Sequence, residues 1–232
     1  GIVREPFQQQ QSNKVAMKPI LIADDHPLFR AALRHAVSAA FPDTPIEEAD
    51  SLPALQTLVE QQRQYSLLLL DLHMPGTHGF SAVIYLRDHY RDTPLVVISA
   101  SDEADVMQRA VGFGANGFIP KSASLDTMVD ALNQVLSGQT WLPETARTSS
   151  AIPASASEQE LARRISSLTP QQFRVLGMLL EGMANKVIAI ELNVSEATVK
   201  AHMTAILRKL GVRNRTQAVL LLRDIAIEAP AS

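Results

Sequence analysis

The feature that most constrains the fold of this chain is a run of four leucines, Leu67 to Leu70, which ends at Asp71 and leads into a Pro-Gly turn. A short, unbroken apolar run closed by turn residues is typical of a strand buried on both faces, as in a parallel sheet covered by helices. Asp71 is therefore predicted at the carboxyl end of a buried strand, the end that lines the ligand crevice in open α/β sheets. A single Asp at this place would more simply begin a turn or cap the next helix, so its meaning depends on its neighbours.

The sequence around this run alternates strand and helix patterns. Short apolar segments predict strands at 20–23, 46–49, 67–71, 95–99 and 117–120. Apolar residues at helical spacing predict helices at 28–40, 52–64, 80–90, 103–113 and 125–137. Five strands that alternate with five helices predict an α/β fold with a doubly wound, five-stranded parallel sheet.

Polar residues of interest lie at the end of, or directly after, the first, third, fourth and fifth predicted strands. Parallel crossovers place the carboxyl ends of the strands at one edge of the sheet, so these side chains are expected to converge there: Asp24, Asp25, Asp71, Ser99 and Lys121. Three carboxylates in one place repel one another unless a cation lies among them, and oxygen ligands with open positions suit Mg²⁺. The alternative is a set of buried acid–amine pairs without any ligand.

These residues also resemble a known family. Residues from about 18 to 138 resemble the receiver domain of bacterial response regulators, through Asp24-Asp25 after the first strand, Asp71 with Pro75 and Gly79 after the third, Ser99-Ala100 after the fourth and Lys121 after the fifth. The resemblance implies a flavodoxin-like sheet and a phosphoryl group that Asp71 accepts from a sensor histidine kinase. A metal ion and an ammonium would neutralise charge on that group, which is most of what phosphoryl transfer requires.

The resemblance also assigns the metal ligands. Asp25 would bind Mg²⁺ directly and Asp24 largely through water, while Asp71 and the backbone carbonyl of His73 would complete the set. Carboxylate and carbonyl oxygens are the ligands that Mg²⁺ prefers, so the implied roles agree with the chemistry expected of the acidic cluster. We therefore expect Mg²⁺ as the cofactor.

Three further residues receive roles around the phosphoryl group. Ser99 would donate a hydrogen bond to it, Lys121 would pair with it, and Phe118 would be an aromatic switch that swings inward. The chain departs from the family in two places. Ser99 stands where threonine is common and keeps the hydroxyl, whereas Ser122 stands where many relatives have a proline after the lysine.

The stretches outside this sheet have different characters. Residues 1–16 show no periodicity and are interpreted as a flexible tail or an expression remnant, which leaves 17–140 for the receiver domain. Residues 141–166 are rich in Ser, Ala, Thr and Pro and are predicted to be a mobile linker, with a helix near 158–165. Residues 167–232 form a separate small domain.

This small domain is predicted to be all-α, with four helices. They are expected at about 170–181, 185–192, 196–210 and 214–228, and Thr169 and Ser195 are expected to cap the first and third. A short helix, a tight turn and a longer helix predict a helix-turn-helix, whose second helix enters the major groove of DNA.

The same segment resembles the LuxR-type helix-turn-helix. The resemblance rests chiefly on Leu168-Thr169-Pro170, Gly182, Asn185-Lys186, Val194-Ser195, Thr198-Val199-Lys200, His202 and Lys209-Leu210. The candidate DNA contacts are Lys186, Thr198, Lys200, His202 and Thr204, with Val199 for a thymine methyl group. Val199 also fits the small core expected from Leu192, Val194, Ile206 and Leu210. Gln172 replaces the usual glutamate, a change expected to affect a cap more than DNA reading.

Composition limits the kinds of site, the cell compartment and the partners that we expect for this chain. The chain has no cysteine, which excludes disulfides and thiolate metal sites. Its apolar runs are far shorter than the ~18 residues of a membrane span and no signal-peptide pattern opens it, so we expect a cytoplasmic protein without a membrane partner. Residues 1–167 hold 13 Lys/Arg against 19 Asp/Glu, whereas residues 168–232 hold 8 against 5, which favours nucleic acid as a partner of the second segment.

These patterns together predict a response regulator of the NarL/FixJ type, a phosphorylation-controlled transcription factor and not an enzyme. The expected partners are a sensor histidine kinase, double-stranded DNA and, as a further candidate, RNA polymerase. An aspartyl-phosphate phosphatase or phosphomutase is the alternative from another class, but it needs a second acid two residues after its nucleophile, where this chain has His73. A third interpretation is an adaptor or transcription factor that works without phosphorylation.

The opposite net charges of the two segments suggest how one controls the other. We expect the unphosphorylated receiver to pack on the recognition helix and phosphorylation to release it. We call the small DNA-binding domain the reader. Its fourth helix carries an apolar strip that is expected to pair the readers of two chains: Ala218, Val219, Leu221, Leu222 and Ile225. The resulting homodimer would occupy two DNA half-sites about one helical turn apart.

Overall fold

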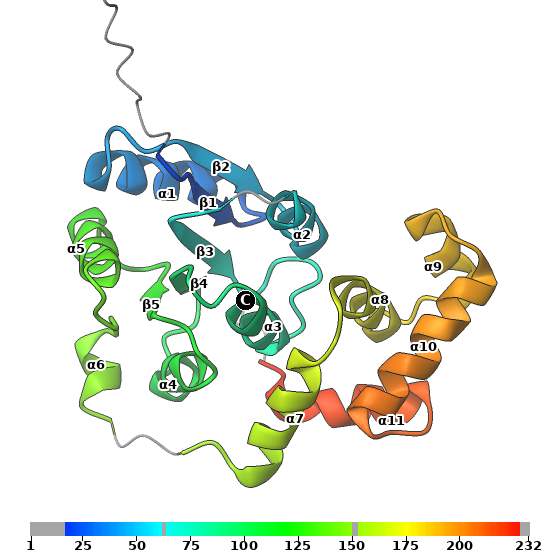
Figure 1. The fold of residues 1–232 in the computed structure, drawn as a ribbon. Coiled ribbons are helices and arrows are strands. Elements are labelled where there is room, and N and C mark those ends of the chain that lie inside the picture. Colours follow the sequence, from blue (N-terminus) through cyan, green and yellow to red (C-terminus); the bar gives the residue numbers. More distant parts are fainter. Residues whose placement is uncertain (1–16, 62–63, 150–152, 228–232) are drawn as a thin grey trace, which may run out of the picture.

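The five predicted strands form one parallel sheet with the bounds expected from the sequence. A computed structural model describes residues 17–61, 64–149 and 153–227. Its strands are β1 (Ile20–Ala23), β2 (Ile46–Ala49), β3 (Leu67–Asp71), β4 (Leu95–Ser99) and β5 (Gly117–Pro120). They pair in the order β2-β1-β3-β4-β5, and every pair is parallel (Figure 1). The doubly wound α/β prediction is confirmed.

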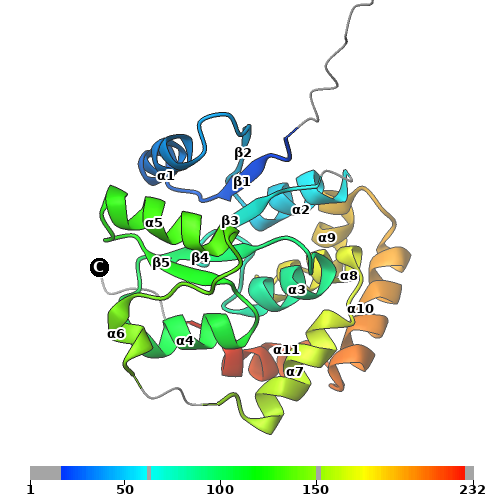
Figure 2. The ribbon, with the colours of Figure 1, turned by 60° about the vertical axis from the view of Figure 1, so that its left-hand side comes forward.

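Helices cover both faces of this sheet. They are α1 (Pro27–Ala40), α2 (Leu52–Glu60), α3 (Ser81–His89), α4 (Ala104–Gly112) and α5 (Leu125–Leu136). Helices α1 and α5 lie on one face, and α2, α3 and α4 lie on the other (Figure 2). The leucines of β3 alternate between the two faces of the sheet. Leu67 and Leu69 belong to the buried cluster under α1 and α5, and Leu68 and Leu70 belong to the one under α2, α3 and α4. Burial on both faces therefore explains the unbroken leucine run.

The small domain contains the predicted helix-turn-helix. Its helices are α8 (Pro170–Leu180), α9 (Asn185–Leu192), α10 (Glu196–Leu210) and α11 (Arg215–Leu222), followed by the 3-10 turn η1 (Arg223–Ile225). Thr169 and Ser195 cap α8 and α10 as predicted, because their hydroxyls accept the amides of Gln172 and Thr198. The Gln172 side chain accepts the Thr169 amide in return, so this departure from the family serves the cap. Gly211, with φ of 71°, ends α10.

Helix ends were predicted less well than helix positions. The helix expected at 52–64 stops at Glu60, and residues 62–63 lie outside the described part of the chain. The helix expected at 214–228 stops at Leu222 and tightens into η1, while residue 228 lies outside the described residues. Neither segment has a glycine or proline at the point where its helix stops, so the apolar pattern alone did not define the end.

The stretch predicted to be a mobile linker is largely packed where the structure describes it. Trp141 is buried, and its carbonyl accepts the Phe118 amide at 3.1 Å, so it extends the receiver beyond the predicted boundary. Helix α6 (Glu144–Arg147), which was not predicted, and α7 (Ala156–Ser166) follow. Helix α7 packs against both α3 and α10 and buries Leu161 and Ile165 (Figure 1). One apolar stripe on α7 therefore joins the two domains.

The two domains share an apolar core on one side of the sheet. Buried side chains from α2, α3 and α4 form one cluster with those of α7, α8, α10 and α11, whereas the cluster under α1 and α5 stays within the receiver. None of the helices that the structure describes is both long and apolar enough to cross a membrane. The shared core places the small domain against the receiver, and the acidic residues of interest lie at the carboxyl edge of the sheet.

Candidate functional site

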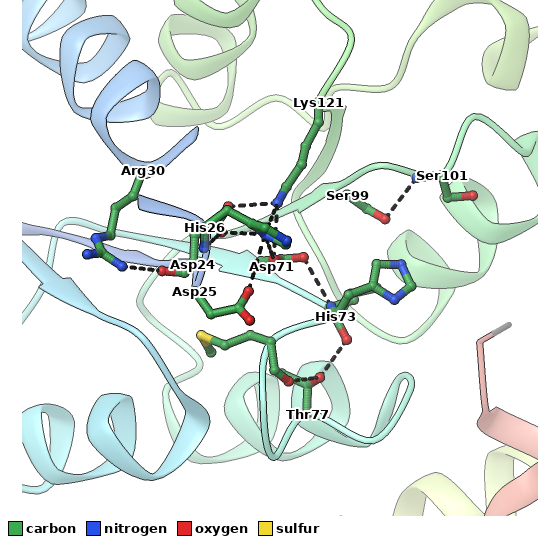
Figure 3. Close-up of polar contacts among 12 residues, drawn as sticks. Asp24, Asp25, His26, Arg30, Asp71, His73, Thr77, Ser99, Ser101 and Lys121 are labelled. Carbon is green, nitrogen blue, oxygen red and sulfur yellow. Dashed lines mark hydrogen bonds and ion pairs between the residues drawn. The ribbon is translucent and has the colours of Figure 1, made fainter. Parts of the chain in front are cut away.

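The acidic side chains lie together at the carboxyl edge of the sheet (Figure 3). The register of the β1–β3 pair brings Asp24 and Asp71 side by side at the strand ends. Both of these carboxylates are fully buried, while the side chain of Asp25 is 32% exposed. Ligand atoms of Asp24, Asp25, Asp71 and His26 all lie within 4.8 Å of one another. The arrangement is thus a compact, mostly buried group of acids.

Lys121 supplies the positive charge of this cluster. Its Nζ lies 2.9 Å from Asp24 Oδ2 and 3.1 Å from Asp71 Oδ2, and 4.7 Å from the centre of the Phe29 ring. Its amide donates to the Ser99 carbonyl at 2.7 Å, which ties the residue after β5 to the end of β4. One ammonium therefore bridges the acids of two strands.

Burial dominates the electrostatics of Asp71. Removing the carboxylate from water raises its pKa above the usual range, and the nearby charge of Asp24 acts in the same direction. The His73 amide, which donates to Asp71 Oδ1 at 3.0 Å, and the ammonium of Lys121 lower the pKa in opposition. Burial and the Asp24 charge therefore disfavour the anionic form of this carboxyl, while the hydrogen bond and the ammonium favour it.

The acidic cluster fits a divalent cation of the Mg²⁺ type. Asp25 Oδ1 is shielded from solvent and accepts no hydrogen bond from the described residues. Together with Asp24 and Asp71 it forms an all-oxygen carboxylate set, which suits Mg²⁺. His26 was missed by the sequence reasoning, although its Nδ1 lies 3.2 Å from both Asp24 Oδ1 and Asp25 Oδ1. His26 directly follows the acid pair, and α1 begins at the next residue, so the His26 ring cannot lie far from the acids. This position in the sequence could have identified it.

Ser99 and Phe118 lie on the two strands beyond β3. The Ser99 side chain is buried, and its hydroxyl accepts the Ser101 amide at 3.1 Å (Figure 3). Phe118 is fully buried in the cluster on the α2–α4 side of the sheet. Its ring therefore already occupies an inward position, and the predicted inward swing does not start from this conformation.

The candidate DNA contacts lie on α9 and α10. The side chains of Lys186, Thr198, Lys200 and Thr204 are exposed, and that of His202 is partly exposed. Val199 is wrong as a DNA contact, because its side chain is fully buried. It shares the inward side of α10 with Met203, Ile206 and Leu210, at the spacing of one helix face. The prediction that Val199 belongs to the small core of the domain is therefore confirmed.

The receiver packs on other helices of the small domain. Tyr85 of α3 stacks on Phe173 of α8, with ring centres 4.2 Å apart and planes inclined by 7°. Arg174 of α8 pairs with Glu60 of α2 at 3.1 Å. Helix α10 lies beyond α8 as seen from the receiver (Figure 1), and its candidate DNA contacts are open to solvent. The expectation that the receiver covers the recognition helix is therefore wrong here, because net charge alone does not choose between surfaces of one domain.

The apolar strip of α11 faces inward. Ala218, Leu222 and Ile225 are buried, while Val219 and Leu221 are partly buried. Within α11, which the structure describes throughout, Leu220 is the one large apolar side chain classed as exposed, at 50%. The strip thus completes the domain core and the contact with the receiver, and the expectation that it pairs two readers does not apply to this conformation.

Two family models match the chain, in the order of its two domains. The model described as response regulator receiver domain matches residues 20–133. The model described as bacterial regulatory proteins, luxR family, matches residues 166–222. The first match contains the acidic cluster and Lys121, and the second contains the helix-turn-helix.

Known proteins resemble the chain along most of its length. It is 40% identical over 217 residues to the glycerol metabolism activator of Pseudomonas putida, covering 92% of this chain and 98% of that protein. It is 31% identical over 201 residues to the nitrate/nitrite response regulator protein NarL of Escherichia coli K12, covering 87% and 93%. In fold it is similar to RcsB of Salmonella typhimurium, with a TM-score of 0.51 at 22% identity over 90% of this chain and 100% of that chain. A structure of two RcsB dimers bound to two parallel DNAs has a TM-score of 0.53 at 20% identity, with the same coverage.

Proposed function

Because the chain belongs to the NarL/FixJ family of two-component response regulators, which join a receiver to a LuxR-type helix-turn-helix, we propose that Asp71 is the residue that accepts the phosphoryl group. Membership makes the protein a DNA-binding regulator of transcription. The observation that supports Asp71 is the placement of its buried carboxylate between the His73 amide and the Lys121 ammonium, within the acidic cluster.

The proposed transfer uses this placement. An oxygen of Asp71 attacks the phosphorus of a phosphohistidine on the sensor kinase and supplies the electron pair of the new O–P bond. The N–P bond breaks and leaves its pair on the kinase histidine nitrogen. Charge is spread over the three phosphoryl oxygens in the transition state, where Lys121 lies close enough to neutralise it. The Ser99 hydroxyl, now held at the Ser101 amide, donates to the transferred group.

The cation site belongs to the same proposal. Asp25 would hold Mg²⁺ directly, with Asp24, Asp71 and the backbone carbonyl of His73 as further ligands, and the close grouping of the three carboxylates supports this assignment. When bound, the ion supplies positive charge to the transferring group. The side chain of His26 is 61% exposed, so its ring has an open path away from the acids.

The DNA-reading surface is assigned to the exposed and partly exposed candidates on α9 and α10: Lys186, Thr198, Lys200, His202 and Thr204. Two copies of the chain would bind DNA as a homodimer, and the DNA-bound RcsB dimers of similar fold support this. RNA polymerase stays a candidate partner, and the cytoplasm is the proposed compartment. The predicted limits were 17–140, 141–166 and 167–232, and we propose to move Trp141 into the receiver, which gives 17–141 for the receiver, 142–166 for the connection and 167–232 for the reader.

The proposed role is regulatory and not enzymatic. Phosphatases and mutases that use an aspartyl phosphate need a second acid two residues after the nucleophile, and this chain has His73 there. What His73 contributes next to Asp71 is its backbone amide. We therefore expect the buried site to hold a phosphoryl group without that acid–base partner for passing it on.

Labelling of the full-length protein by radioactive acetyl phosphate and Mg²⁺ tests the proposal. We expect label on the wild type and none on Asp71→Asn, while Asp102→Asn, which changes an exposed acid after β4, labels like the wild type. Thermal melts confirm that both variants fold. Undiminished label on Asp71→Asn would overturn the assignment. A wild type that binds DNA but never labels would instead favour the phosphorylation-independent regulator.

A further inference from the structure

The side of the recognition helix α10 that faces away from the domain is centred on an alanine. The opposite side is buried in the small core and consists of Val199, Met203, Ile206 and Leu210. Each residue turns about 100° around a helix, so residues two positions apart point in nearly opposite directions. Ala201 stands two positions from both Val199 and Met203, and it is exposed. Its methyl group therefore points directly away from the core.

Ala197 and Thr204 are the neighbours of Ala201 on this outward side, because residues three or four apart share one face of a helix. Both are exposed. We call Ala197, Ala201 and Thr204 the outer face of α10. Lys200 and His202, one position to each side of Ala201, are turned away from it by about 100° and flank the outer face. The charged and aromatic candidates thus lie beside the surface that projects furthest.

The outer face presents methyl groups. The Thr204 hydroxyl donates its one hydrogen to the Lys200 carbonyl at 3.0 Å, so it is held within the helix and the Thr204 methyl group is left for a partner. Ala197 and Ala201 have a methyl group and no polar side-chain atom. Helix α10, which the structure describes throughout, contains neither asparagine nor glutamine, the usual readers of adenine. Hydrogen bonding is therefore not what this face offers to a base.

Only one DNA base presents a methyl group in the major groove. Thymine has a C5-methyl group, and alanine and the threonine methyl group contact it, whereas the other bases are read through hydrogen bonds. Recognition helices contact base edges with their N-terminal residues, and Ala197 and Ala201 lie in the first half of α10 (Glu196–Leu210). Their small size also lets the helix backbone approach the floor of the groove, where the thymine methyl group lies.

We propose that Ala197, Ala201 and Thr204 read thymine methyl groups, so that each half-site of the operator carries thymines under the outer face of α10. The proposal rests on α10 being the DNA-reading helix, which the match of residues 166–222 to the luxR family supports. The buried Val199 takes no part in it. Sequence choice then comes from apolar contact, while Lys200 on the flank contributes affinity through the phosphate backbone.

The DNA side of the proposal is tested by removing single methyl groups. The full-length protein, incubated with acetyl phosphate and Mg²⁺, selects its preferred duplexes from a random pool. Each thymine of a selected half-site is then replaced by deoxyuridine, which lacks only the 5-methyl group, and fluorescence anisotropy measures the dissociation constant at fixed salt. We expect about fourfold weaker binding for each contacted thymine, the loss for one buried methyl group. Thymines outside the half-sites are the control, and their replacement should change nothing.

A matched pair of variants separates the methyl group of Thr204 from its hydroxyl. Thr204→Ser removes the methyl group and keeps the hydroxyl that reaches the Lys200 carbonyl, whereas Thr204→Val keeps a methyl group and removes the hydroxyl. We expect Thr204→Ser to bind the thymine and deoxyuridine duplexes equally at one position, and Thr204→Val to keep the preference for thymine there.

Ala201→Gly tests the centre of the outer face. We expect it to lose the preference for thymine at a different position from the one that Thr204→Ser affects. Each variant is compared with itself on two duplexes, so the cost of glycine within a helix cancels. Thermal melts confirm folding, and the Thr204 pair carries the test if Ala201→Gly does not fold.

The possible failures are distinguishable. Selected half-sites without thymine, or binding that is insensitive to deoxyuridine at every position, would overturn the reading of methyl groups. A preference for thymine that Thr204→Val loses and Thr204→Ser keeps would also overturn it, because the hydroxyl would then be the reading group. If the wild type selects no duplex at all, the DNA-reading assignment of α10 fails and the inference fails with it.

Discussion

The two faces of the receiver sheet are built from similar residues and have different partners. Under α1 and α5, the buried cluster closes within the receiver and includes Leu67, Leu69 and Leu132. Under α2, α3 and α4, the cluster continues into the DNA-binding domain through α7 and α8. A side chain on the closed face can stabilise the receiver alone, whereas one on the shared face also affects where the reader sits.

Helix α3 shows what separates the two faces. Six consecutive residues from Ser81 to Leu86 are buried, although a surface helix normally buries one stripe. One side of α3 lies on the sheet, and its other sides meet α7 and α8 (Figure 2). A helix buried all round needs partners on more than one side, so α3 is completed only when the reader is docked.

The comparison is tested most strongly by truncating one large apolar side chain on each face. Leu132→Ala on α5 and Phe173→Ala on α8 should each lower the free energy of unfolding by about 3 kcal/mol, because each removes buried contacts and leaves a cavity. Urea denaturation measures this loss. X-ray scattering should show separated domains for Phe173→Ala only. Equal domain separation in both variants would break the distinction between the faces.

A polar contact on the shared face should have a smaller effect. Arg109 donates to the Asp224 carbonyl at 2.8 Å and to Glu158 at 3.4 Å, and its guanidinium lies 5.0 Å from the centre of the Phe80 ring. Arg109→Gln should weaken docking by about 1–2 kcal/mol, read as faster hydrogen exchange at the amides of η1. Arg147→Gln on α6 is the control, since Arg147 is exposed, and it should leave that exchange unchanged.

The shared face should also respond to pH through His78. Burial lowers the pKa of its imidazole below 6.5, while the charge of Glu181 and a hydrogen bond with the Gly177 backbone act in the opposite direction. Arg223 lines the same cavity. A group with a depressed folded pKa contributes stability above its unfolded pKa and loses it as pH falls through the folded value. Docking should therefore weaken as pH drops below 6.5, measured by scattering. His78→Asn, which tolerates the positive φ, should remove the pH dependence.

The exposed surface of the recognition helix packs against neither face, and changes there should have the smallest effects. Lys200→Ala should leave docking and stability unaltered but reduce the salt dependence of binding to a DNA duplex, with a change of about 0.9 in the log–log slope for one lost phosphate contact. Lys18→Ala, at an exposed position before β1, should leave the slope unchanged. An unaltered slope for Lys200→Ala would remove this lysine from the DNA interface.

Much of the fold was predictable from the sequence because local signals and burial agreed. All five strands have their predicted bounds, since each is a short apolar run between turn residues. The caps at Thr169 and Ser195 were predictable because a hydroxyl before a helical pattern satisfies free amides. The acidic cluster followed from topology, since parallel strands bring Asp24 and Asp71 to one edge. His26 and the inward position of Phe118 did not follow, because side-chain placement depends on neighbours from other elements.

What the sequence by itself determined is the identity of the two domains, the parallel sheet whose strand ends assemble the acids, and the presence of a helix-turn-helix. Periodicity and motif spacing are local properties, and they are sufficient for these. Only the tertiary structure decided which surfaces meet. It buried Val199, turned the α11 strip inward and set Gly79 against Ile225. Contacts between distant segments depend on shape and packing of both partners at once, and no pattern within either segment records that complementarity.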